Sequence, residues 1–215
     1  MTGMLFATGA AALAITVVVA AQENRPLSPN GTAAAQVMGK YVKPDGRGAP
    51  ALGGANYQGG KWIEITYGRP LKRGRDLFGS GATYGKDALV GTPIWRAGAN
   101  VSTRLKTDVP LVINGKTVAP GEYSLFIDLK ERNWTFVVSS WAAQARYDPN
   151  NKDALWGSYF YTPDKDVLRA PMKLETLPHT IEQLTWAFVD MTDAGGAMAI
   201  SWGNQMASVP FKVQM

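Results

Sequence analysis

The chain has 215 residues, 46% of them hydrophobic, a formal net charge of +5 and no cysteine. The lack of cysteine excludes disulfides, thiolate nucleophiles, cysteine-ligated zinc, iron–sulfur clusters and a lipidated N-terminal cysteine. The single histidine, His179, excludes a multi-histidine metal site, and a Ser-His-acid triad would depend on it entirely. The length suits one domain with a leader and a linker, so the core must hold the fold.

The first 21 residues predict an export signal. Residues 4–21 contain no charged side chain, and they end in small residues before Gln22 and Glu23 break the apolar run. This pattern favours cleavage near Ala20 or Ala21 and predicts a periplasmic or secreted protein. The alternative is an uncleaved inner-membrane anchor, because eighteen apolar residues approach the roughly 20 that span a bilayer. Membrane contact would then be made through residues 4–21.

Residues 22–58 have the composition of a flexible linker. They are rich in Gly, Pro, Ala and Asn, and the runs at 26–31 and 43–48 hold turn-forming residues. Within this segment, residues 32–41 suit a short helix, although no good cap flanks them. We therefore expect a tether between the export segment and a folded domain over residues 59–215.

From Lys61 onward apolar and polar residues alternate. Ile63, Ile65 and Tyr67 share one face of such a run. The same period of two recurs at residues 123–129, 134–138, 186–188, 198–202 and 209–213. The dipeptide Asn114-Gly115 suits a hairpin turn, and no segment beyond residue 60 keeps a helical period over twelve residues. The pattern predicts an all-β fold, an antiparallel β-sandwich of about 8–10 short strands, preceded by the hydrophobic export helix and the linker.

Basic residues gather in one part of the chain, with nine basic against three acidic residues between Lys61 and Lys106. The candidate ligand-binding residues in this part are Arg69, Arg73, Arg75, Arg96 and Asn100. Guanidinium groups present a planar fork of donors that matches carboxylate, phosphate or sulfate. The favoured interpretation of the set is that the arginines pair with nearby carboxylates and fasten loops across the sandwich end. The alternative is an anion or glycan site at that end of the sandwich.

Tryptophans and tyrosines are frequent in or beside the region before Pro163, namely Trp141, Tyr147, Trp156, Tyr159 and Tyr161. Exposed aromatic rings stack on sugars, but large aromatic side chains more often fill a sandwich core, so core packing is the expected role and sugar stacking the alternative. Residues 148–153 carry oxygen ligands that suit calcium without the spacing of a known calcium loop. An Asx-type turn is the favoured interpretation there.

Several linked sequence blocks resemble domain-of-unknown-function family 2911. The blocks lie at residues 65–70, 73–75, 77–79, 95–100 and 120–126, followed by a C-terminal run from 166 to 210. The resemblance covers roughly residues 59–213. It implies bacterial envelope or secreted proteins with a mostly β domain, and it brings no established reaction and no catalytic residues. The chain is longer than the family pattern between Phe78-Gly79 and Trp95, so a pocket formed by that loop is altered here.

These observations favour an exported envelope protein that binds an anionic small molecule or an envelope glycan at a basic loop end without catalysis. One alternative is a carboxylate-dependent hydrolase acting on an envelope glycan, which requires two acids facing each other across a concave pocket. Another is a structural or scaffolding protein that presents an apolar surface patch. We expect no cofactor, no metal and no nucleic-acid partner, because no nucleic-acid-binding motif is visible. Whether the protein is an enzyme stays open.

Overall fold

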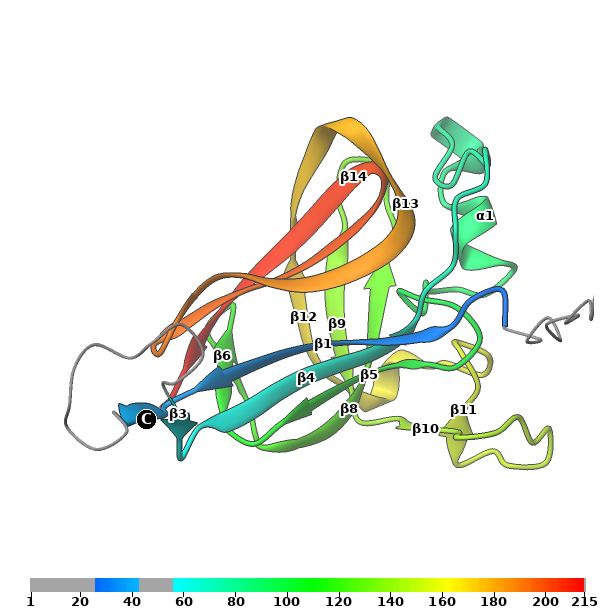
Figure 1. Cartoon of the computed structure of the whole chain (residues 1–215). Coiled ribbons are helices and arrows are strands. Elements are labelled where there is room, and N and C mark those ends of the chain that lie inside the picture. The colour runs from blue at the N-terminus through cyan, green and yellow to red at the C-terminus, as the bar shows by residue number, and fades with distance from the viewer. Residues whose placement is uncertain (1–25, 43–55, 215) are drawn as a thin grey trace, which may run out of the picture.

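The computed structural model describes residues 26–42 and 56–214 (Figure 1). The expected export segment at residues 1–21 lies outside these ranges. Within them, no helix has both the length and the apolar character needed to cross a membrane.

The larger sheet has six antiparallel strands. In order across the sheet they are β1 (Asn30–Val37), β4 (Lys61–Gly68), β5 (Thr103–Thr107), β8 (Gly121–Asp128), β9 (Thr135–Ser139) and β12 (Asp166–Pro171). The alternation at 63–67 places Ile63, Ile65 and Tyr67 in the core, as a half-buried strand requires. The sequence prediction of antiparallel β structure is confirmed.

The second sheet is built around a long hairpin. Its order is β13 (Lys173–Thr192), β14 (Gly195–Val213), β6 (Leu111–Ile113) and β7 (Lys116–Val118). β13 and β14 are longer than the pattern indicated, because their ladder continues past register shifts such as the one between Thr176 and Ile181. That shift contains Pro178, which has no N–H to donate to a ladder. Asn114 and Gly115 join β6 to β7 with φ of 48° and 76°, as the predicted hairpin turn requires.

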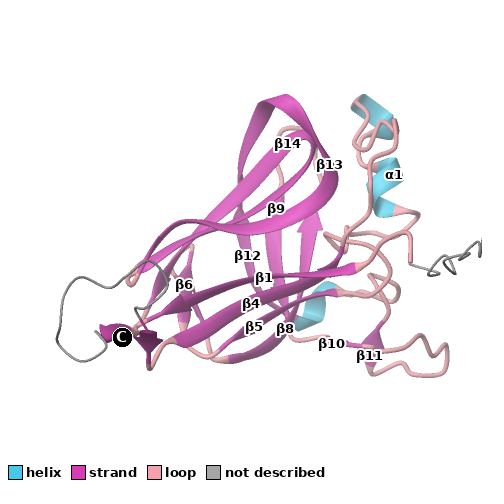
Figure 2. Ribbon diagram, viewed as in Figure 1, coloured by secondary structure: helices cyan, strands magenta, loops and turns pink. Residues whose placement is uncertain are grey.

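Smaller elements complete the chain. They are β2 (Lys40–Val42) paired with β3 (Asn56–Gln58), β10 (Ala142–Ala143) parallel to β11 (Ala154–Leu155), the short helix α1 (Lys86–Leu89) and 3₁₀ turns at Gly81–Thr83 and Pro163–Lys165. The loop with α1 and the loop with β10 and β11 lie at the same end of the sandwich, opposite β2 and β3 (Figure 2).

Part of the expected linker is a strand. Residues 30–37 pair with β4 along their whole length, from Asn30 opposite Gly68 to Val37 opposite Lys61. Neither a flexible tether nor a helix at 32–41 agrees with this ladder, so both expectations are wrong for residues 30–37. Exposure does alternate along β1, but the inward positions before Val37 are the small residues Gly31, Ala33 and Ala35. Alanine gives only a weak apolar signal, and backbone pairing at the sheet edge holds the segment instead.

Indole rings fill the space between the two sheets. Trp95 stacks on Trp202 with ring centroids 6.2 Å apart and meets Trp134 edge-on at 5.9 Å. Trp186 packs against Phe136 of the larger sheet at 6.3 Å. Because the core includes these four tryptophans, the protein is held together without a disulfide.

Candidate functional site

A buried junction holds two of the family-like sequence blocks together at the loop end. Tyr67 Oη accepts a hydrogen bond from the Trp186 backbone N–H at 3.0 Å, and Trp186 Nε1 donates to the carbonyl of Ala97 at 2.9 Å. Gly68 lies so close to Ala99 that an added Cβ would collide with the Ala99 carbonyl oxygen. The junction therefore fixes the backbone next to Arg69 and Arg96.

The five candidate residues from the sequence have three different surroundings. Arg96 Nη1 donates to the Asn100 carbonyl at 3.2 Å, so these two residues do come together. Arg75 turns back on its own loop, donating to the carbonyls of Leu71 and Lys72, and lies 5.3 Å from the Trp202 ring centroid. The Arg73 side chain is exposed, and the Nε of Arg69 is buried without a hydrogen-bond partner.

No hydrogen bond among the described residues joins Arg69, Arg73 or Arg75 to the pair formed by Arg96 and Asn100. None of the four arginines forms an ion pair with a described carboxylate. The structure thus reduces the predicted cluster to one pair, Arg96 with Asn100. It also leaves the charge of Arg96 without an acidic partner in the described parts of the chain.

An aromatic pocket of about 280 Å³ lies beside this pair. It is lined by Gln144, Tyr147, Asp148, Trp156, Tyr159 and Phe160. Tyr147 is 56% exposed, Tyr159 42% and Phe160 61%, although apolar rings are normally withdrawn from water. Of the five aromatic residues for which the sequence predicted core packing, with sugar stacking as the alternative, Tyr147, Trp156 and Tyr159 line the pocket. Tyr161 instead packs on Phe126, with ring centroids 4.9 Å apart.

Sequence reasoning missed Phe160. Its φ of 64° places it in the left-handed region, which is unusual and costly for a bulky residue. This backbone holds the ring outward, where the Nζ of Lys152 lies 4.2 Å from the ring centroid. Neither the backbone angle nor the contact has a local sequence signal beyond the aromatic run at residues 159–161.

Hydrogen bonds make the pocket loop rigid. The Nε2 of the buried Gln144 side chain lies within hydrogen-bond distance of the carbonyls of Asp148, Asn151 and Ala154, which share its two N–H donors, and its Oε1 accepts from the Asp148 N–H at 2.8 Å. Ser102 Oγ donates to the Gly157 carbonyl at 2.6 Å, which fastens the loop to the sandwich. A loop ordered before a ligand arrives loses little entropy on binding.

Asx turns shape the segment at 148–153, as the sequence favoured over a calcium loop. Asp148 Oδ1 accepts from the Asn150 N–H at 2.9 Å, and Asn151 Oδ1 accepts from the Asp153 N–H at 3.1 Å. Within the described ranges, no three acidic or histidine side chains gather as metal ligands would.

Arg96 stands over one wall of the aromatic pocket. Its guanidinium carbon lies 5.9 Å from the ring centroid of Tyr159, a cation–π arrangement. Burial lowers the pKa of Arg96, and the nearby Tyr159 partly offsets this effect. Gly157 makes room for the guanidinium, because a Cβ there would lie 2.5 Å from Arg96 Nη1. The result is a partly buried cation at the edge of an aromatic surface.

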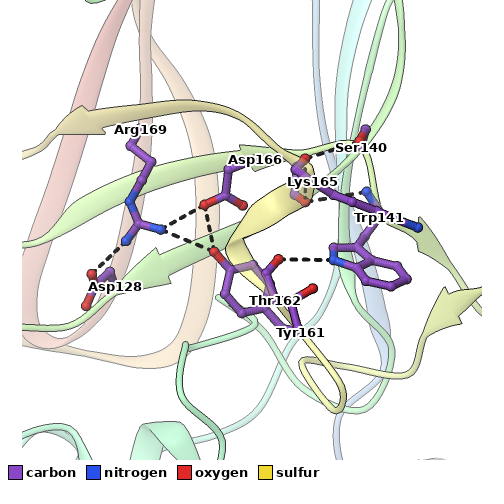
Figure 3. A network of polar contacts seen from close by, with 9 residues as sticks. Asp128, Ser140, Trp141, Tyr161, Thr162, Lys165, Asp166 and Arg169 are labelled. Atoms are coloured by element: carbon purple, nitrogen blue, oxygen red, sulfur yellow. Dashed lines mark hydrogen bonds and ion pairs between the residues drawn. The ribbon is translucent and has the colours of Figure 1, made fainter. Parts of the chain in front are cut away.

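A polar network anchors the far end of the pocket loop (Figure 3). Tyr161 Oη donates to Asp166 Oδ2 at 2.7 Å, and Arg169 bridges Asp166 and Asp128 at 2.8 and 2.7 Å. Burial, then the hydrogen bond to Asp166, raises the pKa of Tyr161. Burial alone would lower the pKa of Arg169, but the hydrogen bond to Asp166 and the neighbouring negative charges raise it. The network holds Tyr161 directly after the exposed rings.

A second hollow, of about 420 Å³, lies under the loop that follows β4. Its ionisable lining residues are Lys72, Asp76, Tyr84, Glu131 and Arg132. Asp76 and Glu131 thus line one concavity, the placement that a two-carboxylate hydrolase requires.

Two packed antiparallel sheets with ligand-sized pockets in the loops at one end define a β-sandwich protein with loop-built candidate sites. A family model described as a protein of unknown function, DUF2911, matches residues 52–211, and the chain belongs to that family. This confirms the resemblance expected from the sequence blocks. No curated protein and no solved structure matches the chain.

Proposed function

We propose that the protein is a non-catalytic domain that binds an anionic glycan in the aromatic pocket beside Arg96. The observation that carries this proposal is the partly buried guanidinium of Arg96. It stands over Tyr159 and has no acidic partner among the described residues. A desolvated charge without a partner is costly, so an anionic ligand group at that position gains both attraction and hydrogen bonds.

The pocket chemistry supports a sugar as the carrier of the anionic group. Exposed rings of Tyr147, Tyr159 and Phe160 offer apolar faces for the C–H side of a sugar ring. Arg96 Nη1 donates a hydrogen bond to the Asn100 carbonyl. The remaining N–H donors of the guanidinium form the planar fork that a carboxylate or sulfate group matches. The volume of about 280 Å³ lies just below the roughly 300–1,000 Å³ of pockets for drug-sized ligands. It therefore suits a single sugar ring, with the rest of the glycan running over the surface.

The hydrolase alternative fits this pocket less well. Hydrolysis of a glycosidic bond requires two carboxyl groups, but Asp148 is the one acidic residue that lines the aromatic pocket among the described residues. One of its oxygens already accepts the Asn150 N–H. The scaffolding alternative requires a flat apolar patch, whereas these exposed rings surround a concavity.

A place in the cell envelope is part of the proposal and is supported by the uncharged run at residues 4–21. Cell fractionation with mass spectrometry of the mature N-terminus tests it. We expect the protein in the periplasm or medium, with a chain that begins after Ala20 or Ala21. Recovery of the intact chain in the cytoplasm would refute export.

The binding test uses a tetrasaccharide of galacturonic acid and its methyl ester, in which a small methyl group replaces the negative charge of each carboxylate. We expect calorimetry to show binding of the acid and at least tenfold weaker binding of the ester. A charge-assisted hydrogen bond contributes about 1.5–3 kcal/mol, which is about tenfold or more in affinity.

Two substitutions locate the site. Arg96→Gln should abolish the preference for the acid over the ester, and Tyr159→Ala should weaken binding of both the acid and the ester. Arg73→Gln removes the same charge from an exposed arginine of the predicted set and should leave binding unchanged. Equal affinity for acid and ester, or equal losses from Arg96→Gln and Arg73→Gln, would refute the proposed site.

A further inference from the structure

The second hollow is built from three separate segments of the chain. The loop after β4 contributes Lys72, Asp76 and Tyr84, and the turn between β8 and β9 contributes Glu131 and Arg132. β13 and β14 close it from the other side through residues that include Asn204. Its volume of about 420 Å³ lies within the roughly 300–1,000 Å³ usual for small-molecule sites.

Both acidic residues of the hollow are held in place by one oxygen each. Asp76 Oδ1 accepts the Gly79 N–H at 3.1 Å, and Glu131 Oε2 accepts the Gly81 N–H at 3.0 Å. The other oxygen of each carboxylate has no hydrogen-bond partner among the described residues. These bonds orient the two acids and leave each with acceptor capacity.

The basic residues of the hollow do not neutralise these acids. Neither Lys72 nor Arg132 takes part in an ion pair within the described ranges, although both line the same concavity as Asp76 and Glu131. Opposite charges that share a hollow without pairing present separated positive and negative positions to a ligand. The four charges sum to zero, so they favour neither a purely anionic nor a purely cationic molecule.

Tyr84 adds an oriented hydroxyl group. Its oxygen accepts a hydrogen bond from Trp134 Nε1 at 2.6 Å, which leaves its own proton available for another acceptor. Burial raises the pKa of Tyr84, against the lowering effect of the Trp134 hydrogen bond, and the charge of Glu131 raises it further. The phenol therefore stays protonated and serves as a donor, while the buried side chains of Leu77 and Phe78 form an apolar part of the lining.

We propose that this hollow binds a zwitterionic ligand, a free amino acid or a short peptide. The ligand ammonium group lies against the free oxygens of Asp76 and Glu131, and its carboxylate lies against Lys72, Arg132 and the Tyr84 hydroxyl. A side chain of the ligand contacts Leu77 and Phe78. This site is separate from the aromatic pocket and does not rest on the glycan proposal.

The test measures binding of alanyl-alanine to the purified full chain by calorimetry. N-acetyl-alanyl-alanine lacks the ammonium charge, and alanyl-alanine amide lacks the carboxylate. We expect saturable binding of the dipeptide and at least about tenfold weaker binding of each derivative, the loss that follows from one missing charge-assisted hydrogen bond.

Two substitutions assign the ends of the ligand. Glu131→Gln should weaken binding of the dipeptide, but it should not add to the loss of binding that acetylation already causes. Likewise, Arg132→Gln should weaken binding of the dipeptide without adding to the loss that amidation causes. Glutamine keeps a carbonyl that accepts the Gly81 N–H, so Glu131→Gln should fold normally, which a thermal melt checks. Arg96→Gln and Tyr159→Ala should leave dipeptide binding unchanged, whatever they do to glycan binding.

Three outcomes would overturn the inference. One is the absence of dipeptide binding at millimolar concentration by the folded chain. Another is binding that is unaffected by acetylation and by amidation. The third is hydrolysis of a glycan by the wild-type protein that Asp76→Asn and Glu131→Gln both abolish, because that result would assign the two acids to catalysis.

Discussion

Replacing Gly157 by alanine perturbs the aromatic pocket through a single atom. Gly157 has φ of 64°, and a Cβ there would lie 2.5 Å from Arg96 Nη1 and 3.1 Å from the Asn100 carbonyl oxygen. The left-handed conformation alone costs an L-residue about 1–2 kcal/mol. The clash adds to this cost unless the guanidinium moves away. We therefore expect Gly157→Ala both to lower the free energy of unfolding and to displace Arg96 from Tyr159.

Gly74→Ala provides a matched control. Gly74 has φ of 72°, and nothing lies within 4 Å of an added Cβ, so this variant carries the conformational cost without the clash. Urea denaturation should show about 1–2 kcal/mol of destabilisation for Gly74→Ala and more for Gly157→Ala. Calorimetry with the galacturonate tetrasaccharide should show a loss of about tenfold for Gly157→Ala alone. If folded Gly157→Ala bound the acid as tightly as the wild type, Arg96 would not be the anion-binding group.

Three further predictions concern the pocket loop and the fold. The pKa of Tyr161 is raised in the folded state, so its contribution to stability is complete below the unfolded value near 10 and is lost as the pH rises through the folded value. Urea titrations from pH 8 to 11 should therefore show a free energy of unfolding that falls above pH 10. The fall should be shallower in Tyr161→Phe. An identical fall in both proteins would exclude Tyr161 as its source. Trp95 is 1% exposed, and Trp95→Ala should lower the free energy of unfolding by about 3–5 kcal/mol in the same assay, whereas a loss below about 1 kcal/mol would contradict its place in the core. Hydrogen–deuterium exchange should show protected amides within residues 30–37, since β1 pairs with β4, and complete exchange within seconds would restore the linker interpretation.

The fold could be predicted from the sequence where apolar and polar side chains alternate. Ile63 and Ile65 alternate with polar neighbours, and both lie in the core. β1 could not be recognised, because Ala33 and Ala35 face inward with too little apolar surface to stand out from a linker. β1 pairs with β4 through the backbone at a sheet edge, and apolar periodicity in the sequence does not reveal such pairing.

The candidate site could be predicted only in part, because exposure and direction depend on contacts between distant residues. Arg96 and Asn100 are four residues apart and do meet, but Arg75 turns back to the carbonyls of Leu71 and Lys72. Among the aromatics, Tyr161 turns inward through its bond to Asp166. Nothing in the local sequence distinguishes it from Tyr159, which stays at the surface.

The core and the two pockets are parts of one packed arrangement. Trp134 contributes its Nε1 to the hydroxyl of Tyr84 in the hollow, and its ring meets Trp95 at 5.9 Å. Trp95 immediately precedes Arg96, whose guanidinium borders the aromatic pocket. Because interiors are close-packed, the tryptophan side chains that exclude water from the core also fix the positions of Tyr84 and Arg96 at the two sites. Rigid placement of Tyr84 and Arg96 therefore follows from the same tryptophans that hold the sheets together.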